Sequence, residues 1–287
     1  MVSKDSFRKS WKLWALGFLA LANLLVWLAA YGRVAGDELS VYFLDVGQGD
    51  AILIDSPTHG RVLIDGGKNR KVLSELGKVL PFGARRIDVL IATHPDADHI
   101  GGLPEVVSRY RVGAYIQPDV KSDSSLDDEL DRRVKAKNIP ELMAERGMVI
   151  NFNDGARLTI LFPNQDVSSW DTNDASVVAR LTYGESEFLL TGDAGLKTEQ
   201  ILVNLGDTLE SDVLKAGHHG SRTSTSPNFA TAVGPLFAVI SAGKDNSYGH
   251  PHKEVLNTLN NIGSRILNTA ESGTIKFETD GKSLRIK

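Results

Sequence analysis

The sequence reads Ile87-Asp-Val-Leu-Ile-Ala-Thr-His94-Pro-Asp96-Ala-Asp98-His99 near the middle of the chain. The largely apolar first half of this stretch is typical of a buried strand. The polar loop that follows holds four nitrogen and oxygen donors, His94, Asp96, Asp98 and His99, within six residues. Because a turn at a strand end directs its side chains into one pocket, this loop predicts a metal site.

Two further groups of donor residues also follow predicted strands. The run Leu189-Leu-Thr-Gly-Asp193 ends in a carboxylate, although a single Asp in a turn is usually only a turn former. The run Lys215-Ala-Gly-His218-His219-Gly-Ser221 places adjacent histidines between glycines, which favours metal ligation by at least one of them. The sequence holds no cysteine, so a metal ion must be bound by His, Asp or Glu.

Other polar residues are candidates for contact with a substrate. His250, in Tyr248-Gly-His-Pro-His252, is a candidate proton-transfer group, with a surface histidine as the alternative. The residues predicted to contact substrate from the turns after predicted strands are Gln48, Asp50, Lys215 and Ser221. For these four candidates, the alternative to substrate contact is an ordinary structural role in a turn or at the surface.

Short β runs separated by Gly and Pro signals alternate with helical patterns. The predicted strands are residues 39–46, 51–55, 61–65, 87–92, 157–161, 176–181, 187–191, 212–215, 236–241, 265–269 and 274–278. The predicted helices are residues 71–80, 103–109, 196–205 and 253–262, with a pair of charged surface helices within 122–146. No Pro- or Ser-rich linker interrupts this order. It therefore predicts one α+β domain over residues 39–287, in which helices cover two packed sheets.

The segment before this domain is apolar. Residues 13–32 carry no charge and a single polar side chain, Asn23, and about 20 such residues span a ~30 Å hydrocarbon core as a helix. We therefore predict a transmembrane anchor at 13–32, between a basic tail at 1–12 and a linker at 33–38. Because basic residues favour the cytoplasmic side of a membrane, the basic tail predicts a cytoplasmic N-terminus. With one apolar segment, the chain would cross the membrane once, as a single-pass membrane protein, and the domain would be extracytoplasmic. The alternative is a cleaved signal peptide, which would leave the domain secreted.

The domain beyond this segment is acidic. The net charge of the chain is −4, and residues 1–36 hold five basic side chains and one acidic one, so the remainder carries −8. Such a charge does not favour non-specific binding to phosphate backbones, and it argues against a DNA-coating module. Bound divalent metal ions would offset this charge locally.

The ordered motifs resemble those of a known family. The HxDxDH pattern at 94–99, followed by TGD at 191–193 and HHGS at 218–221, resembles the metallo-β-lactamase superfamily. Three more motifs are similar to the extracytoplasmic hydrolase domain of ComEC-type competence proteins, which take up transforming DNA. These motifs are LDVGQGDAILI at 44–54, LIDGG at 63–67 and YGHP at 248–251. The resemblance covers residues 38–280.

The resemblance implies an αββα four-layer sandwich with two divalent metal ions at one edge of its sheets. His94 and Asp96 would bind the first ion, Asp98 and His99 would bind the second, and Asp193 would bridge the two. Two ions ~3.5–4 Å apart would activate a shared hydroxide and stabilise the charge on a phosphoryl group.

The resemblance leaves open which of the two adjacent histidines binds the second ion. His218 or His219 would complete the second metal site, with His219 favoured. Asp98 and His250 are the predicted catalytic residues.

One departure from the superfamily pattern concerns the first metal ion. Many members place a third histidine between the HxDxDH loop and the TGD strand, but no histidine occurs here between His99 and His218. Asn173 stands near that position and is a further candidate for substrate contact. Oxygen-rich ligation would weaken zinc binding at this site and favour manganese or magnesium. We therefore predict two divalent ions, zinc or manganese, with magnesium and a mononuclear site as alternatives.

The leading functional hypothesis is hydrolysis of phosphodiester bonds in DNA outside the membrane by a metal-bound hydroxide. These 287 residues hold no multi-helix channel, so a role in DNA uptake does not follow. The second hypothesis is hydrolysis of a small ester, such as a phosphocholine ester or a lactone. The third is a non-catalytic nucleic-acid-binding domain with a decayed site, against which the retained histidines and aspartates argue. No obligate protein partner is predicted.

Overall fold

The computed structural model describes residues 4–31, 38–122, 124–206, 208–244 and 246–287. Contacts within the chain divide it into two units, residues 1–37 and 38–287. Residues 1–3 of the predicted basic tail, residue 32 of the predicted anchor and residues 33–37 of the predicted linker lie outside the described residues.

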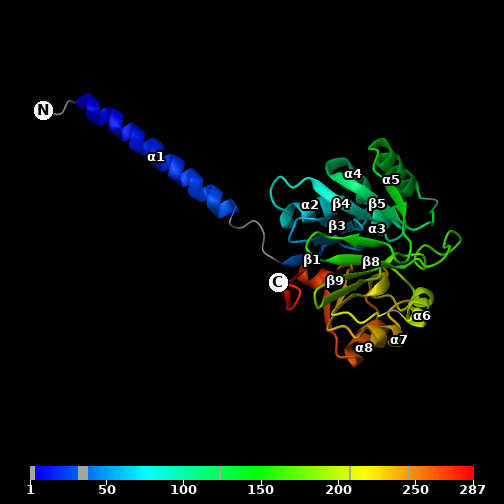
Figure 1. Ribbon diagram of the computed structural model, residues 1–287. Helices are drawn as coiled ribbons and strands as arrows, with labels where there is room; N and C mark the ends of the chain where they lie inside the picture. The colour runs from blue at the N-terminus through cyan, green and yellow to red at the C-terminus, as the bar shows by residue number, and fades with distance from the viewer. Residues whose placement is uncertain (1–3, 32–37, 123, 207, 245) are drawn as a thin grey trace. The chain divides into compact units, whose positions relative to one another are not determined.

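The described residues of the first unit form one long helix, α1 (Lys4–Tyr31) (Figure 1). Its large apolar side chains are exposed, with Trp14 at 80% and Phe18 at 73%. Within the described part of the chain, no helix combines the length and the hydropathy that a membrane span requires.

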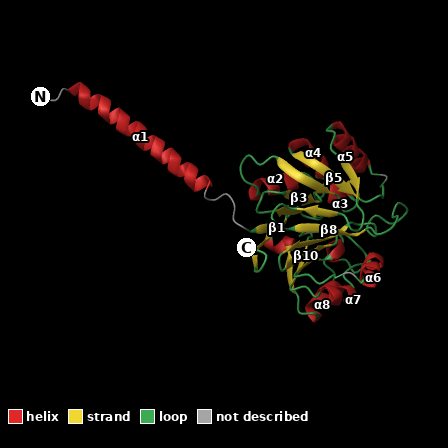
Figure 2. Cartoon of the chain, in the orientation of Figure 1, coloured by secondary structure: helices red, strands yellow, loops and turns green. Residues whose placement is uncertain are grey.

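The second unit is built around two sheets (Figure 2). Within the described residues, the first sheet has eight strands. In spatial order these are β15 (Leu284–Ile286), β14 (Ile275–Thr279), β1 (Leu39–Phe43), β2 (Ile52–Asp55), β3 (Arg61–Ile64), β4 (Arg86–Ile91), β5 (Arg111–Gln117) and β6 (Glu141–Met143). The strands from β15 to β3 pair antiparallel, and those from β3 to β6 pair parallel.

The second sheet has seven strands within the same residues. In spatial order these are β13 (Arg265–Asn268), β12 (Phe237–Ile240), β11 (Val213–Lys215), β10 (Ser186–Leu190), β9 (Val178–Tyr183), β8 (Arg157–Phe162) and β7 (Val149–Asn151). The strands from β13 to β10 pair parallel, and those from β10 to β7 pair antiparallel.

Apolar side chains hold the two sheets face to face. Phe43 and Phe277 of the first sheet pack edge to face, with ring centroids 5.9 Å apart. Phe188 of the second sheet contacts the same Phe277 ring, also at 5.9 Å. All three rings are fully buried. Alternate residues along each strand face this inner layer, because successive side chains of a strand point to opposite faces of the sheet.

Helices cover the outer face of each sheet. Those that pack on the first sheet are α2 (Lys71–Val79), α4 (Leu103–Arg109) and α5 (Ser125–Ala136). Those that pack on the second sheet are α6 (Leu196–Leu205), α7 (Pro227–Val233) and α8 (Lys253–Asn261). Short helical turns are α3 (Ala97–Ile100), η1 (Gly217–Gly220) and α9 (Thr269–Ser272). The four layers confirm the predicted αββα sandwich.

One predicted element is wrong. We predicted a pair of surface helices within residues 122–146, but the structure forms a single helix there, α5, followed by the strand β6. Pro140 lies directly before β6, and a proline inside a helix removes a backbone donor. The next residues instead pair parallel with β5, from Tyr115 opposite Glu141 to Gln117 opposite Met143.

Candidate metal centre

Three loops from the two sheets meet at the carboxyl ends of parallel strands. The loop after β4 leads into α3 and carries His94, Asp96, Asp98 and His99. The loop after β10 carries Asp193, and the loop after β11 forms η1 with the two histidines 218 and 219. The carboxyl edge of parallel strands is the usual place for ligand sites in α/β sheets. The fold therefore gathers residues that lie up to 125 positions apart in the sequence.

Asp193, His99 and His219 direct donor atoms to one point, and Asp98 lies beside His219. Oδ2 of Asp193 lies 3.3 Å from Nε2 of His99 and 3.2 Å from Nε2 of His219. The two Nε2 atoms are 3.4 Å apart, and Oδ2 of Asp98 lies 3.2 Å from Nε2 of His219. Donors ~3.4 Å apart are the edges of a tetrahedron with bonds of ~2.1 Å, as in zinc sites. The donor set therefore fits a divalent metal ion.

The opposite ring nitrogens of these histidines are bonded elsewhere. Nδ1 of His99 lies 2.8 Å from Oδ2 of Asp65, and Nδ1 of His219 lies 2.8 Å from the carbonyl oxygen of Ser241. Asp65 in turn accepts hydrogen bonds from the backbone N–H and the hydroxyl of Thr93. Such partners fix the orientation of a metal-binding imidazole, with its Nε2 free for the ion.

A second pair of donors lies beside this group. His94 is buried, and its ring centroid is 4.1 Å from that of His99. Its Nδ1 contacts the hydroxyls of Thr93 at 3.1 Å and Ser176 at 3.2 Å, and its Nε2 lies 3.8 Å from Oδ2 of Asp96. This arrangement brings together the two residues predicted to bind the first ion.

The structure distinguishes the two adjacent histidines. Both adopt left-handed backbone angles, with φ of 47° at His218 and 54° at His219, between the glycines of η1. This tight turn buries the side chain of His219 and leaves that of His218 28% exposed, with its Nε2 3.9 Å from Oδ2 of Asp193. The geometry therefore places His219, the favoured candidate, among the converging donors and His218 at the rim.

A small cavity of about 130 Å³ opens beside the donors. Its lining includes two predicted substrate contacts, Gln48 and Asn173, together with the predicted catalytic His250. Gln48 comes from the loop after β1, where Gly49 has a φ of +116° and a Cβ would lie 1.9 Å from the carbonyl oxygen of Asp98. Only glycine fits this close approach of the two loops. Sequence reasoning did not select Tyr248, which also lines the cavity.

Three other predicted substrate contacts do not line this cavity. Lys215 is fully buried beneath the donors and forms an ion pair with Asp50, which is also buried. Ser221 is buried as well, and its hydroxyl lies 3.0 Å from that of Thr223. The structure therefore corrects the prediction for Asp50, Lys215 and Ser221, because side chains enclosed in this way are not available to a substrate.

Comparison with known proteins identifies the family. A family model described as the metallo-beta-lactamase superfamily matches residues 44–244. The chain belongs to the metallo-β-lactamase superfamily. This membership confirms the family resemblance of the HxDxDH, TGD and HHGS motifs.

Relatives narrow this assignment to the ComEC-type branch. ComE operon protein 3 of Bacillus subtilis (strain 168) is 34% identical over 258 residues, which cover 84% of this chain and 33% of the relative. Competence protein ComA of Neisseria gonorrhoeae is 33% identical over 250 residues, which cover 85% of this chain and 33% of the relative. The chain thus spans about a third of the length of these curated relatives.

A solved structure supports the fold. The metallo-β-lactamase fold protein YhfI from Bacillus subtilis superposes with a TM-score of 0.58 and 13% identity, covering 84% of this chain and 100% of that chain. The chain is therefore a metallo-β-lactamase-fold protein of a metallo-hydrolase superfamily, with a candidate metal-binding group of His and Asp residues.

The charges of neighbouring donors shift the pKa values of His99, His219 and Asp193. Burial alone would lower the pKa values of His99 and His219, but the carboxylate of Asp193 raises both well above the usual range. Burial would raise the pKa of Asp193, but these two imidazoliums hold it well below the usual range. In the metal-free chain the two protonated rings therefore balance the negative charge of the buried Asp193 carboxylate, and a metal cation would take over this role.

Two histidines have lowered pKa values. Burial lowers the pKa of His94 well below its usual range, and the nearby charge of His99 acts in the same direction. Burial and the neighbouring histidines lower the pKa of His250 to about 4. Both rings are therefore neutral at pH 7, and a neutral imidazole offers the lone pair that a metal ligand or a proton acceptor requires.

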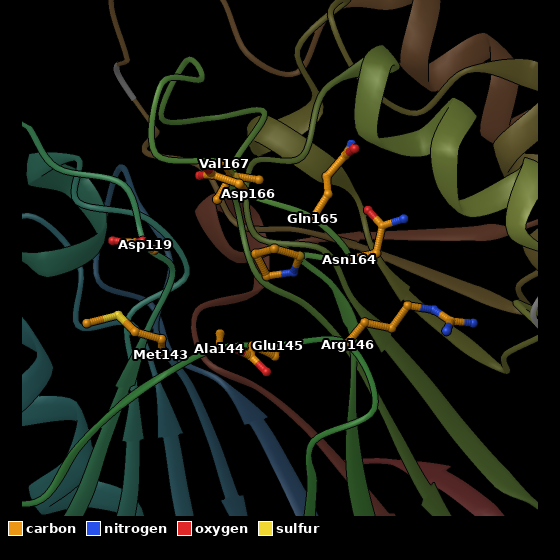
Figure 3. Close-up of a pocket in the computed structure, with 10 residues that line it drawn as sticks. Asp119, Met143, Ala144, Glu145, Arg146, Asn164, Gln165, Asp166 and Val167 are labelled. Carbon is orange, nitrogen blue, oxygen red and sulfur yellow. The ribbon is translucent and has the colours of Figure 1, made fainter.

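A larger cavity of about 450 Å³ lies elsewhere in the domain (Figure 3). It is formed by residue 119 after β5, by residue 143 at the end of β6 with residues 144–146 after it, and by residues 163–167 after β8. Its charged lining residues are Asp119, Glu145, Arg146 and Asp166. This lining contains no histidine, so we assign the candidate chemistry to the smaller cavity beside the converging donors.

Proposed function

We propose that this chain is an extracytoplasmic metal-dependent phosphodiesterase that cleaves DNA. The observation that carries the proposal is the convergence of His99, Asp193 and His219, with donor atoms 3.2–3.4 Å apart, beside an open cavity. Asp98 adds a carboxylate oxygen 3.2 Å from Nε2 of His219. Relatives named for competence support DNA as the substrate. The whole activity of those longer proteins is not assumed for this chain.

Each residue of the centre has a distinct role in this proposal. His99, Asp98 and His219 would hold one ion, His94 and Asp96 would hold a second, and Asp193 would lie between them. Bound divalent cations supply Lewis-acid activation of water and charge stabilisation of the phosphoryl group.

The cavity residues would orient the substrate. Gln48 and Asn173 line one cavity together with His250, so their amides are available to phosphate oxygens or bases. His250 is neutral at pH 7 because its pKa is lowered to about 4, and it would accept a proton from the attacking water or donate an N–H to the phosphate.

The test uses the whole 287-residue chain in detergent. We expect cleavage of single-stranded or double-stranded DNA in zinc or manganese, and loss of at least about 100-fold in rate for Asp98→Ala. Asp128→Ala is the matched control, because Asp128 is an exposed aspartate on α5. Equal rates for the two variants would overturn the proposal.

A second candidate is hydrolysis of a small ester. The modest cavity volume of about 130 Å³ and the acidic balance of the domain favour a small substrate. Stoichiometric metal without DNA cleavage, combined with turnover of a phosphocholine ester or a lactone, would select this candidate. A chain that binds DNA but holds no metal would select a non-catalytic binding role.

We also propose that α1 anchors the chain in the membrane with the domain outside. The exposed apolar side chains of this helix, including Trp14 and Phe18, support this location. The test is membrane fractionation after an alkaline carbonate wash, followed by protease treatment of intact cells. A chain that washes off the membrane would contradict an anchor, and a protected domain would contradict the outward orientation.

A further inference from the structure

A buried lysine lies directly beneath the candidate metal centre. Lys215, the last residue of β11, is fully buried. Its Nζ donates a 2.7 Å hydrogen bond to the carbonyl oxygen of Gly192, lies 3.3 Å from Oδ1 of Asp193 and pairs with the carboxylate of Asp50. These three partners match the three protons of an ammonium group, so its position is fully determined.

The contact with Lys215 orients the carboxylate of Asp193. Oδ1 of Asp193 is directed to the lysine, whereas Oδ2 is directed to Nε2 of His99 and His219. A free carboxylate would be able to rotate and present both oxygens to one ion. With Oδ1 held from below, Asp193 presents a single oxygen to the centre.

Asp50 pairs with the lysine and lies next to the converging donors. Its carboxylate approaches the Nδ1 atoms of the histidines, at 3.5 Å from His219 and 4.0 Å from His99. Both Nδ1 atoms are already bonded to other partners, and the metal-facing nitrogens are the Nε2 atoms on the opposite side. Asp50 therefore contacts the Nδ1 side of the rings, and it is one of four buried residues, with His99, Asp193 and His219, whose possible ligand atoms lie within 4.8 Å of one another.

We propose that Lys215 and Asp50 form a buried clamp that positions Asp193 for metal binding. The proposal rests on the metal centre of the proposed function but not on its substrate. Lys215 is thus a positioning residue, and Asp50 holds it in place.

The charge of Lys215 and its contact with Asp193 predict opposite effects of Lys215→Met on metal affinity. A lysine near a cation repels it, so if charge alone mattered, Lys215→Met would tighten metal binding. If the lysine positions Asp193, the same substitution weakens metal binding, and loss of such supporting contacts weakens metal binding about 10–100-fold.

The experiment measures zinc affinity of the whole chain by competition with a chelator. We expect Lys215→Met to raise the Kd for zinc about tenfold or more. We also expect it to change the visible absorption spectrum of the cobalt-substituted chain, because that spectrum reports the coordination of the ion. Lys135→Met, at an exposed lysine of α5, is the matched control and should leave both unchanged.

The double variant Lys215→Met with Asp50→Asn decides between the two explanations. It removes one positive and one negative charge, so the summed charge around the centre equals that of the wild type. It leaves no unpaired charge of this pair in the interior, and replacing a buried ion pair by neutral groups is often tolerated. Thermal unfolding of the metal-free variants checks their fold.

Each outcome is distinct. Weak zinc binding and an altered cobalt spectrum in the double variant support the clamp. Wild-type affinity in the double variant, or unchanged or tighter binding in Lys215→Met, overturns it. A wild-type chain that binds no metal overturns the proposed function together with the clamp, whereas metal binding that the variants leave unaltered overturns the clamp alone.

Discussion

Oδ2 of Asp65 lies 2.8 Å from Nδ1 of His99, although the two residues are 34 positions apart. Both side chains are fully buried, and Asp65 also accepts two hydrogen bonds from Thr93. The carboxylate therefore holds the His99 ring with its Nε2 toward Asp193. This arrangement is the carboxylate–histidine pair that commonly supports a metal ligand.

Loss of the Asp65 carboxylate should weaken the centre without removing a ligand. We expect Asp65→Asn to raise the Kd for zinc about 10–100-fold, because an amide orients and polarises the imidazole less effectively. Chelator competition measures the change, with Asp128→Asn at an exposed aspartate as the control. An unchanged Kd would show that His99 does not depend on Asp65.

The two adjacent histidines should differ in their effect on metal content. His219→Ala removes a donor whose Nε2 lies 3.2 Å from both Asp98 and Asp193, so we expect the ion at that position to be lost. His218→Ala changes a ring at the rim and should leave metal content unchanged. Elemental analysis of the purified variants measures this. Loss of metal in His218→Ala alone would reverse the assignment.

Much of the centre can be predicted from sequence because its donors follow strand ends. His94, Asp96, Asp98 and His99 follow β4, and Asp193 follows β10, so the parallel strands bring them to one edge. A resemblance to a known family supplied the roles of these residues. The predicted strands and helices rest on short apolar runs, on the helical spacing of apolar residues and on the Gly and Pro turn signals.

The rest depends on contacts between distant segments. Lys215 appears in the sequence beside a histidine pair and was assigned to the substrate, but its side chain turns inward to Asp50, 165 positions earlier. Asp65 lies within a motif that was recognised, yet its contact with His99 has no local signal. The strand β6 was missed because its pairing with β5 outweighs the helical composition around it.

Metal binding should depend on pH. The raised pKa values of His99 and His219 mean that both rings hold protons at neutral pH in the metal-free chain, and an ion must displace them. The Kd for zinc should therefore fall as the pH rises above the ordinary histidine pKa of about 6.5. While zinc binding releases two protons, the fall is up to about 100-fold per pH unit. Calorimetry in buffers of different ionisation enthalpy counts these protons. Zinc binding without proton release would contradict the assignment.

The raised pKa values of His99 and His219 also predict how the stability of the metal-free chain depends on pH. A histidine whose pKa is raised by folding stabilises the folded state fully below its unfolded pKa of about 6.5. That stabilisation is lost as pH rises through the raised values of His99 and His219. Urea unfolding of the metal-free chain should therefore show falling stability above about pH 6.5. Stability that rises over this interval would contradict the prediction.

The layer between the sheets should dominate stability. Phe188 is fully buried against Phe277, so Phe188→Ala should lower the free energy of unfolding by about 3–5 kcal/mol. Phe82 is fully exposed, and Phe82→Ala should change it by less than about 0.5 kcal/mol. Urea denaturation measures both, and similar values for the two would contradict the observed packing.

The most direct test of the central claim is DNA cleavage by the whole chain before and after metal removal. We predict that a chelator abolishes cleavage, and that zinc or manganese restores it once the chelator has been dialysed away. Cleavage that persists without metal, or a metal-loaded chain that leaves DNA intact, would contradict a metal-dependent DNA phosphodiesterase.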